Sequence, residues 1–175
     1  MGEPNKLHPL THQTLLNCVE HVDYEVGMLL GLLDLPVNRA PKPHDFSRPE
    51  TLHYLSRLEA LVAHIRVLDE FLCGPPKESR SDDLFARHYL STWDPQRSVI
   101  GMPARDRANK QLAHLTTVRA TKQRGWAFRK LVTDLAKEFL RFVEALEPES
   151  DFADAFGQTR ERLASFLQPP VHSGQ

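Results

Sequence analysis

Residues 128–146 read FRKLVTDLAKEFLRFVEAL and carry the most regular hydrophobic pattern of the chain. Apolar residues recur there every three or four positions, at Phe128, Leu131, Val132, Leu135, Phe139, Phe142, Val143 and Leu146. Successive residues of an α-helix are about 100° apart, so this spacing gathers the apolar side chains on one face and leaves charged ones on the other. The pattern predicts an amphipathic helix over 125–146 that buries its apolar face against other elements.

The same spacing predicts the remaining elements. Three further long helices are expected over residues 11–34, 50–73 and 103–119, with shorter ones near 82–90 and 151–167. Ser47 and Glu50 have the spacing of a capping box for the second long helix, and Ser150 is positioned to cap the last short one. Prolines and glycines between these segments stop the helices and mark the connections.

The predicted fold class is all-α, because no useful stretch alternates apolar and polar residues as a strand does. We expect an antiparallel helical bundle of four long helices plus one or two short helices. A chain of 175 residues is long enough for one substantial core and too short for two comfortable domains. Residues 1–168 are therefore assigned to a single helical-bundle domain and residues 169–175 to a disordered tail.

Composition narrows the classes of partner. The chain has 22 Lys and Arg against 23 Asp and Glu, a formal net charge of −1, so any contact with nucleic acid depends on a local patch. Its apolar runs are too short to span a membrane, and its start lacks the apolar segment of a signal peptide. We expect a cytoplasmic protein with no membrane contact, in which Cys18 and Cys73 are buried free thiols.

One polar row stands out in the segment predicted to be helical over 103–119. Arg107 and His114 are seven positions apart, close to two helical turns, with Lys110 between them. The apolar residues of the same segment, among them Leu112 and Leu115, fall about 100° away from this row. The helix is therefore expected to bury Leu112 and Leu115 while Arg107 and His114 face solvent or a groove.

This row resembles the Arg-x(4–6)-His signature of the HEPN superfamily, small all-α bundles that include many metal-independent ribonucleases. The phrase from Asn109 to Thr117, NKQLAHLTT, is also similar to a stretch of bacterial proteins grouped near that superfamily. The resemblance implies an endoribonuclease or RNA-binding component of a bacterial defence or toxin system. It also implies a homodimer in which two motifs meet, a cognate protein partner, and neither a metal nor another cofactor.

The side chains of the motif suit RNA cleavage by the substrate's own 2′-hydroxyl. Such a reaction needs proton transfer at two oxygens and positive charge beside the developing phosphorane. His114 titrates near neutral pH and Arg107 offers a planar fork for two phosphate oxygens, so these two residues are the predicted catalytic pair. Lys110 and Gln111 are the predicted substrate-binding residues.

Two other functions stay open on the sequence alone. A surface helix with this composition is ordinary, so a non-catalytic helical interaction or oligomerisation protein is the principal alternative. A metal-dependent bundle enzyme comes third, because His21, His53 and His64 lie in the first two predicted helices and bundles build metal sites from such residues. Trp93 and Trp126 flank the motif segment and serve either as anchors for loops or as platforms for a stacked base.

Overall fold

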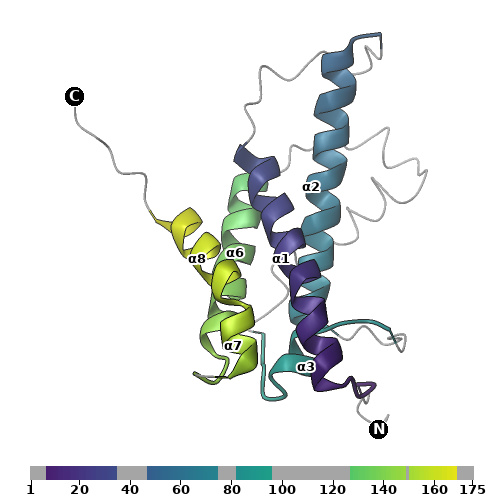
Figure 1. Cartoon of the computed structure of the whole chain (residues 1–175). Coiled ribbons are helices and arrows are strands. Elements are labelled where there is room, and N and C mark those ends of the chain that lie inside the picture. Colours follow the sequence, from purple (N-terminus) through teal and green to yellow (C-terminus); the bar gives the residue numbers. More distant parts are fainter. Residues whose placement is uncertain (1–6, 35–46, 75–81, 96–126, 149, 169–175) are drawn as a thin grey trace, which may run out of the picture.

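The computed structural model describes residues 7–34, 47–74, 82–95, 127–148 and 150–168. The helices within these ranges are α1 (His12–Asp34), α2 (Pro49–Cys73), α3 (Ala86–Tyr89), α6 (Phe128–Glu144), α7 (Asp151–Ala155) and α8 (Gly157–Leu167) (Figure 1). The described ranges contain no strand, which confirms the all-α class. None of these helices is long and apolar enough to cross a membrane.

The helices form two antiparallel pairs, α1 with α2 and α6 with α8 (Figure 1). At the end of α1, Arg57 of α2 donates hydrogen bonds to the carbonyl oxygens of Leu32 (2.6 Å) and Leu33 (2.9 Å). These bonds satisfy carbonyls that have no partner inside α1 and so fix the α1–α2 pair. Helices α2 and α6 run in the same direction (Figure 1).

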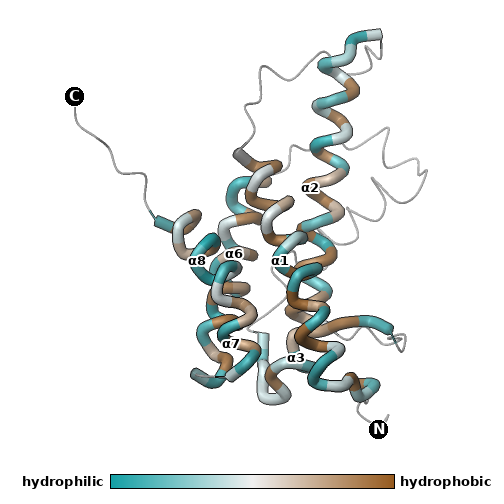
Figure 2. The backbone as a smooth tube through the Cα atoms, in the orientation of Figure 1, coloured by the Kyte–Doolittle hydropathy of each residue, from teal (hydrophilic) through white to brown (hydrophobic). Residues whose placement is uncertain are grey.

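A single cluster of buried apolar side chains lies between these helices. Figure 2 shows hydrophobic and hydrophilic residues alternating along the helices, as burial of one helix face requires. Phe142 is fully buried and lies at the centre of an aromatic group, with ring centroids 5.3 Å from Trp93, 5.6 Å from Phe71 and 5.7 Å from Phe156. The stripe predicted over 125–146 is therefore the main contribution of α6 to the core.

Several predicted helix boundaries need correction. Arg48 is the N-cap of α2 and makes no side-chain cap hydrogen bond, so the predicted Ser47–Glu50 capping box is wrong. Phe85 is extended, with φ −134° and ψ 153°, which limits the helix predicted near 82–90 to α3. The element predicted over 151–167 is two helices, α7 and α8, which meet at Phe156.

Other local predictions have mixed outcomes. Ser150 caps α7 as predicted, because its Oγ accepts a hydrogen bond from the amide of Ala153 (3.2 Å). Leu52, expected on the buried stripe, keeps 48% of its surface exposed, since the first turns of α2 extend beyond the neighbouring helices (Figure 1). Cys18 and Cys73 are free thiols, but both are only partly buried. The helix predicted over 103–119 lies outside the described residues.

Candidate functional site

The predicted site residues Arg107, Lys110, Gln111 and His114 lie outside the described residues, as do Leu112, Leu115 and Trp126. Both ends of the segment that carries them are described. Asp94, just before the segment, contacts Arg141 in the last turn of α6, whereas Ala127, just after it, is the N-cap of α6. The segment therefore begins and ends at opposite ends of the same helix.

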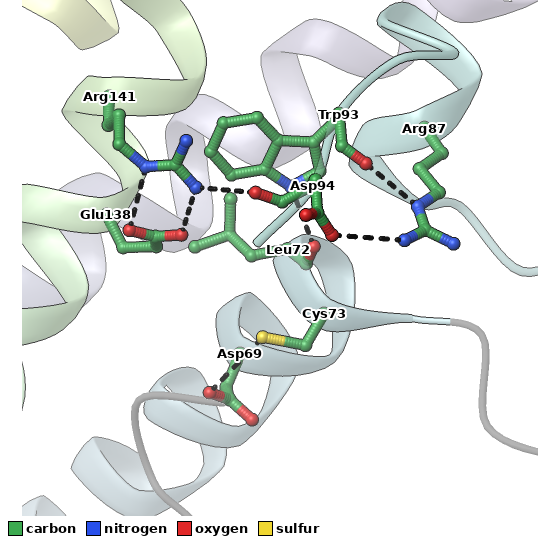
Figure 3. Close-up of polar contacts among 8 residues, drawn as sticks. All are labelled: Asp69, Leu72, Cys73, Arg87, Trp93, Asp94, Glu138 and Arg141. Carbon is green, nitrogen blue, oxygen red and sulfur yellow. Dashed lines mark hydrogen bonds and ion pairs between the residues drawn. The ribbon is translucent and has the colours of Figure 1, made fainter. Parts of the chain in front are cut away.

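The first of these two ends is fixed by a group that we call the Trp93 corner: Arg87, Trp93, Asp94, Glu138 and Arg141 (Figure 3). The indole of Trp93 is 3% exposed, and its Nε1 donates a hydrogen bond to the carbonyl oxygen of Leu72 (2.9 Å). Leu72 lies in the last turn of α2, where carbonyls lack a partner inside the helix. Trp93 thus ties the chain to the end of α2 and is one of the two expected loop anchors, with no face free for a stacked base.

Arg141 completes the Trp93 corner from α6. Its guanidinium carbon lies 4.0 Å from the centre of the Trp93 ring, a cation–π contact. The same guanidinium donates to both carboxylate oxygens of Glu138 (2.6 and 3.1 Å) and to the carbonyl oxygen of Asp94 (2.9 Å). The hydrogen bonds that Arg141 donates to Glu138 raise the pKa of Arg141, so the guanidinium stays charged at every accessible pH.

Asp69 is a second buried carboxylate near the corner (Figure 3). Asp69 is fully buried. The thiol of Cys73, one turn later on α2, donates a hydrogen bond to Asp69 Oδ1 (3.9 Å). A carboxylate out of contact with water is stable only when other groups satisfy it. Asp69 and Glu138 are the buried acidic residues of the described chain.

The described histidines make separate local contacts. His64 Nδ1 lies 2.6 Å from Glu25 Oε2, and His12 Nε2 lies 3.0 Å from Asp151 Oδ2. Within the described ranges no group of three or more His, Cys, Asp or Glu side chains is close enough together to hold a metal ion. The metal-site alternative built on His21, His53 and His64 therefore has no supporting geometry in this part of the chain.

His88 of α3 connects two segments that are far apart in the sequence. Its Nδ1 accepts a hydrogen bond from the amide of Phe85 (3.0 Å), and its Nε2 donates to the carbonyl oxygen of His8 (3.2 Å). Burial lowers the pKa of the imidazole, and the contact with Phe85 requires an unprotonated Nδ1. His88 is therefore a neutral positioning residue for the turn that leads into α3.

A groove opens between α1, α2 and residues 82–85, and we call it the acidic groove. It has a volume of about 510 Å³, within the range of ligand sites. Its apolar lining includes Tyr24, Val67 and Leu84, and its acidic lining consists of Glu25, Glu70, Asp82 and Asp83. Tyr24 and Val67 are among the exposed large hydrophobic residues of the described chain, with 58% and 46% of their surface accessible.

One wall of the acidic groove depends on a close approach to α2. A Cβ atom added at Gly74 would lie 2.0 Å from Cδ1 of the Phe85 ring, so only glycine leaves room for Phe85 at this position. From the sequence, the glycine that follows the second long helix predicts only the end of that helix, so the groove was not predicted. The available signal was Tyr24 and Val67, two large apolar residues that fall outside the buried stripes of their helices.

Comparison with known proteins adds no relative: no protein family, curated protein or solved structure matches the chain.

Proposed function

We propose that the chain is a HEPN-like helical protein that acts on RNA at a site formed by Arg107 and His114. In this proposal it is a metal-independent endoribonuclease, or an RNA-binding component, of a bacterial defence or toxin system in the cytoplasm. The observation that supports the proposal is the position of Asp94 and Ala127, the two residues that bracket the motif segment, at opposite ends of α6.

The lengths of the two segments agree with this proposal. Helix α6 has 17 residues and spans about 25 Å at about 1.5 Å per residue. A helix over residues 103–119 has the same number of residues, 17, and the same span of about 25 Å. Such a helix would return the chain from one end of α6 to the other and complete the proposed bundle of four long helices.

The proposed chemistry assigns a role to each polar residue of the motif. His114 exchanges the proton with the reacting oxygens, and Arg107 holds two oxygens of the phosphate as negative charge develops. Lys110 and Gln111 bind the RNA backbone beside them. Because one chain supplies one motif imidazole, a homodimer that joins two motifs would provide both the proton acceptor and the proton donor.

A non-catalytic helical interaction protein, with a second copy or a cognate protein as its partner, is the second candidate. The observation that favours it is the exposure of Tyr24 and Val67 in the acidic groove, since exposed apolar side chains that gather on one surface mark protein contacts. The two candidates differ in whether purified protein cleaves RNA when all metal is chelated.

The test incubates end-labelled RNAs with purified wild-type protein in excess EDTA and identifies the product ends. The proposal predicts cleavage with a 2′,3′-cyclic phosphate, because the attacking group is the neighbouring hydroxyl of the substrate. Arg107→Lys should lose much of the activity, since an ammonium keeps the charge without the bidentate fork. Arg105→Lys is the matched control, because Arg105 lies about 200° away from Arg107 on the predicted helix. Inactive wild-type protein on varied RNAs would favour the interaction protein.

A further inference from the structure

The two ring nitrogens of His88 have different backbone partners. Nδ1 lies 3.0 Å from the amide nitrogen of Phe85, and Nε2 lies 3.2 Å from the carbonyl oxygen of His8. An amide N–H only donates and a carbonyl oxygen only accepts, so both bonds form with the neutral ring that carries its proton on Nε2. The geometry therefore sets both the charge and the tautomer of His88.

The amide that His88 accepts belongs to a residue whose side chain closes one wall of the acidic groove. Phe85 is 5% exposed, and its ring packs against Gly74 at the end of α2. The same ring stacks on the imidazole of His88, with centroids 5.7 Å apart. Helix α3 has only four residues, so the bond to His88 is a principal link between the turn at Phe85 and the helix.

Protonation of the imidazole would break one of its two bonds and keep the other. A protonated ring is a donor at both nitrogens, so Nδ1–H would face the N–H of Phe85, whereas Nε2–H would still donate to His8. A buried amide without an acceptor is unfavourable, but the same amide bonds to water once the turn opens. Protonation therefore favours a state in which Phe85 has left Gly74.

Burial is the main reason why the folded ring resists protonation. It lowers the pKa of His88 below the ordinary value of 6.5. The ionisable side chains on the segments around α3 do not contribute to this shift, and they include His8, His12, Glu70, Asp82, Asp83 and Arg87. Opening of the turn returns the ring to water and removes the effect of burial, so opening and proton uptake favour each other.

We propose that His88 is a proton-operated latch: uptake of a proton at Nδ1 releases Phe85 from Gly74 and opens one wall of the acidic groove. The released state gains population as the pH falls, and the core around Phe142 stays folded. Return to neutral pH restores the bond to Phe85 and closes the wall. The latch is independent of the RNA proposal, because none of its residues belongs to the motif segment.

The test measures amide hydrogen exchange of wild-type protein by NMR from about pH 7.5 to about pH 5, with each rate corrected for its intrinsic dependence on pH. The protection factor of the Phe85 amide should fall by up to about tenfold for each pH unit between the pKa values of the open and closed ring. Constant protection would overturn the proposal. Equal protection of Phe85 and Leu135, a buried residue of α6, at the lower pH would also overturn it, because Phe85 would then exchange only by global unfolding.

Two variants assign the effect to His88. His88→Asn offers an amide oxygen to Phe85 and does not titrate, so the protection of Phe85 should stay constant with pH. His12→Asn is the matched control, because the side chain of His12 is 57% exposed and bonds to Asp151 instead. It should keep the wild-type fall. The same fall in His88→Asn, or its loss in His12→Asn, would overturn the proposal.

The wild-type ring also provides a check that needs no variant. The nitrogen chemical shifts of His88 distinguish the two neutral tautomers from each other and from the protonated ring. At neutral pH they should show a single proton, on Nε2, because the Phe85 amide occupies Nδ1. A neutral ring with its proton on Nδ1 would overturn the proposal.

Discussion

The Trp93 corner and the acidic groove both lie beside the end of α2, and they use charge and aromatic groups in opposite ways. In the corner, Arg141 covers the Trp93 ring and is itself held by Glu138. In the groove, Tyr24 and Val67 are exposed beside carboxylates. The corner pairs its polar groups with one another, whereas the groove leaves the side chains of Tyr24 and Val67 exposed to solvent.

The two regions should differ in how much their side chains contribute to the free energy of unfolding. An interaction that is closed inside the fold contributes to the free energy of unfolding, and its removal leaves buried groups without partners. An exposed apolar group contributes little to folding, so its replacement changes the free energy of unfolding little. We therefore expect substitutions in the corner to lower the free energy of unfolding and substitutions of the exposed groove residues to leave it nearly unchanged.

Trp93→Ala should have the largest effect on stability. The substitution removes a buried ring from the aromatic core and leaves the Leu72 carbonyl without its indole donor. Replacing a buried aromatic residue by alanine typically lowers the free energy of unfolding by about 3–5 kcal/mol. Urea denaturation followed by circular dichroism measures the loss. A change below about 1 kcal/mol would show that the corner does not hold the core together.

Arg141→Lys should have the next largest effect. A lysine keeps the charge but loses the stacked plane over Trp93 and the paired bonds to Glu138. The Arg141 side chain is 38% exposed, so solvent screening reduces the expected loss to about 1 kcal/mol. The same denaturation experiment on Lys137→Arg, an exposed position of α6, is the control and should show no change.

The free energy of unfolding should depend modestly on pH through His88 of α3. Burial lowers the pKa of folded His88, so the unfolded chain takes up the proton more readily. The contribution of His88 to stability is therefore present above its ordinary pKa of about 6.5 and falls as the pH drops through that value. His88→Asn keeps an acceptor for the Phe85 amide without titrating. The difference in unfolding free energy between this variant and wild type should shift in favour of the variant below about pH 6.5. A difference that is constant with pH would contradict this assignment.

Groove substitutions should have the smallest effect on stability. Tyr24→Ser and Val67→Ser remove exposed side chains, and each should change the free energy of unfolding by less than about 0.5 kcal/mol. Thermal unfolding measures both variants against wild type. A loss of 2 kcal/mol or more, roughly the cost of emptying a core position, would mean that these residues belong to the fold and would remove the contrast with Trp93.

The sequence predicted the features that depend on periodicity along one helix. The stripe from Phe128 to Leu146 lies on a helix that buries one face, and Ser150 caps α7 as expected. The acidic groove could not be predicted in this way, because it depends on where Phe85 meets Gly74 and on how α1 crosses α2. The short length of α3 could not be predicted either. Phe85 is extended where it packs against Gly74, a contact between residues that are distant in the sequence, and α3 therefore begins only at Ala86.

The candidate site was predicted from residue types and their spacing, and a measurement of RNA cleavage tests it. The most direct measurement is the rate of RNA cleavage by folded His114→Ala in excess EDTA, compared with wild type and with His53→Ala, an exposed histidine of α2. Loss of a positioned acid or base typically slows a reaction by about 10²–10⁴-fold. The account predicts a loss of that size for His114→Ala, no loss for His53→Ala, and unchanged unfolding for both. Equal cleavage rates for folded His114→Ala and wild type would contradict it.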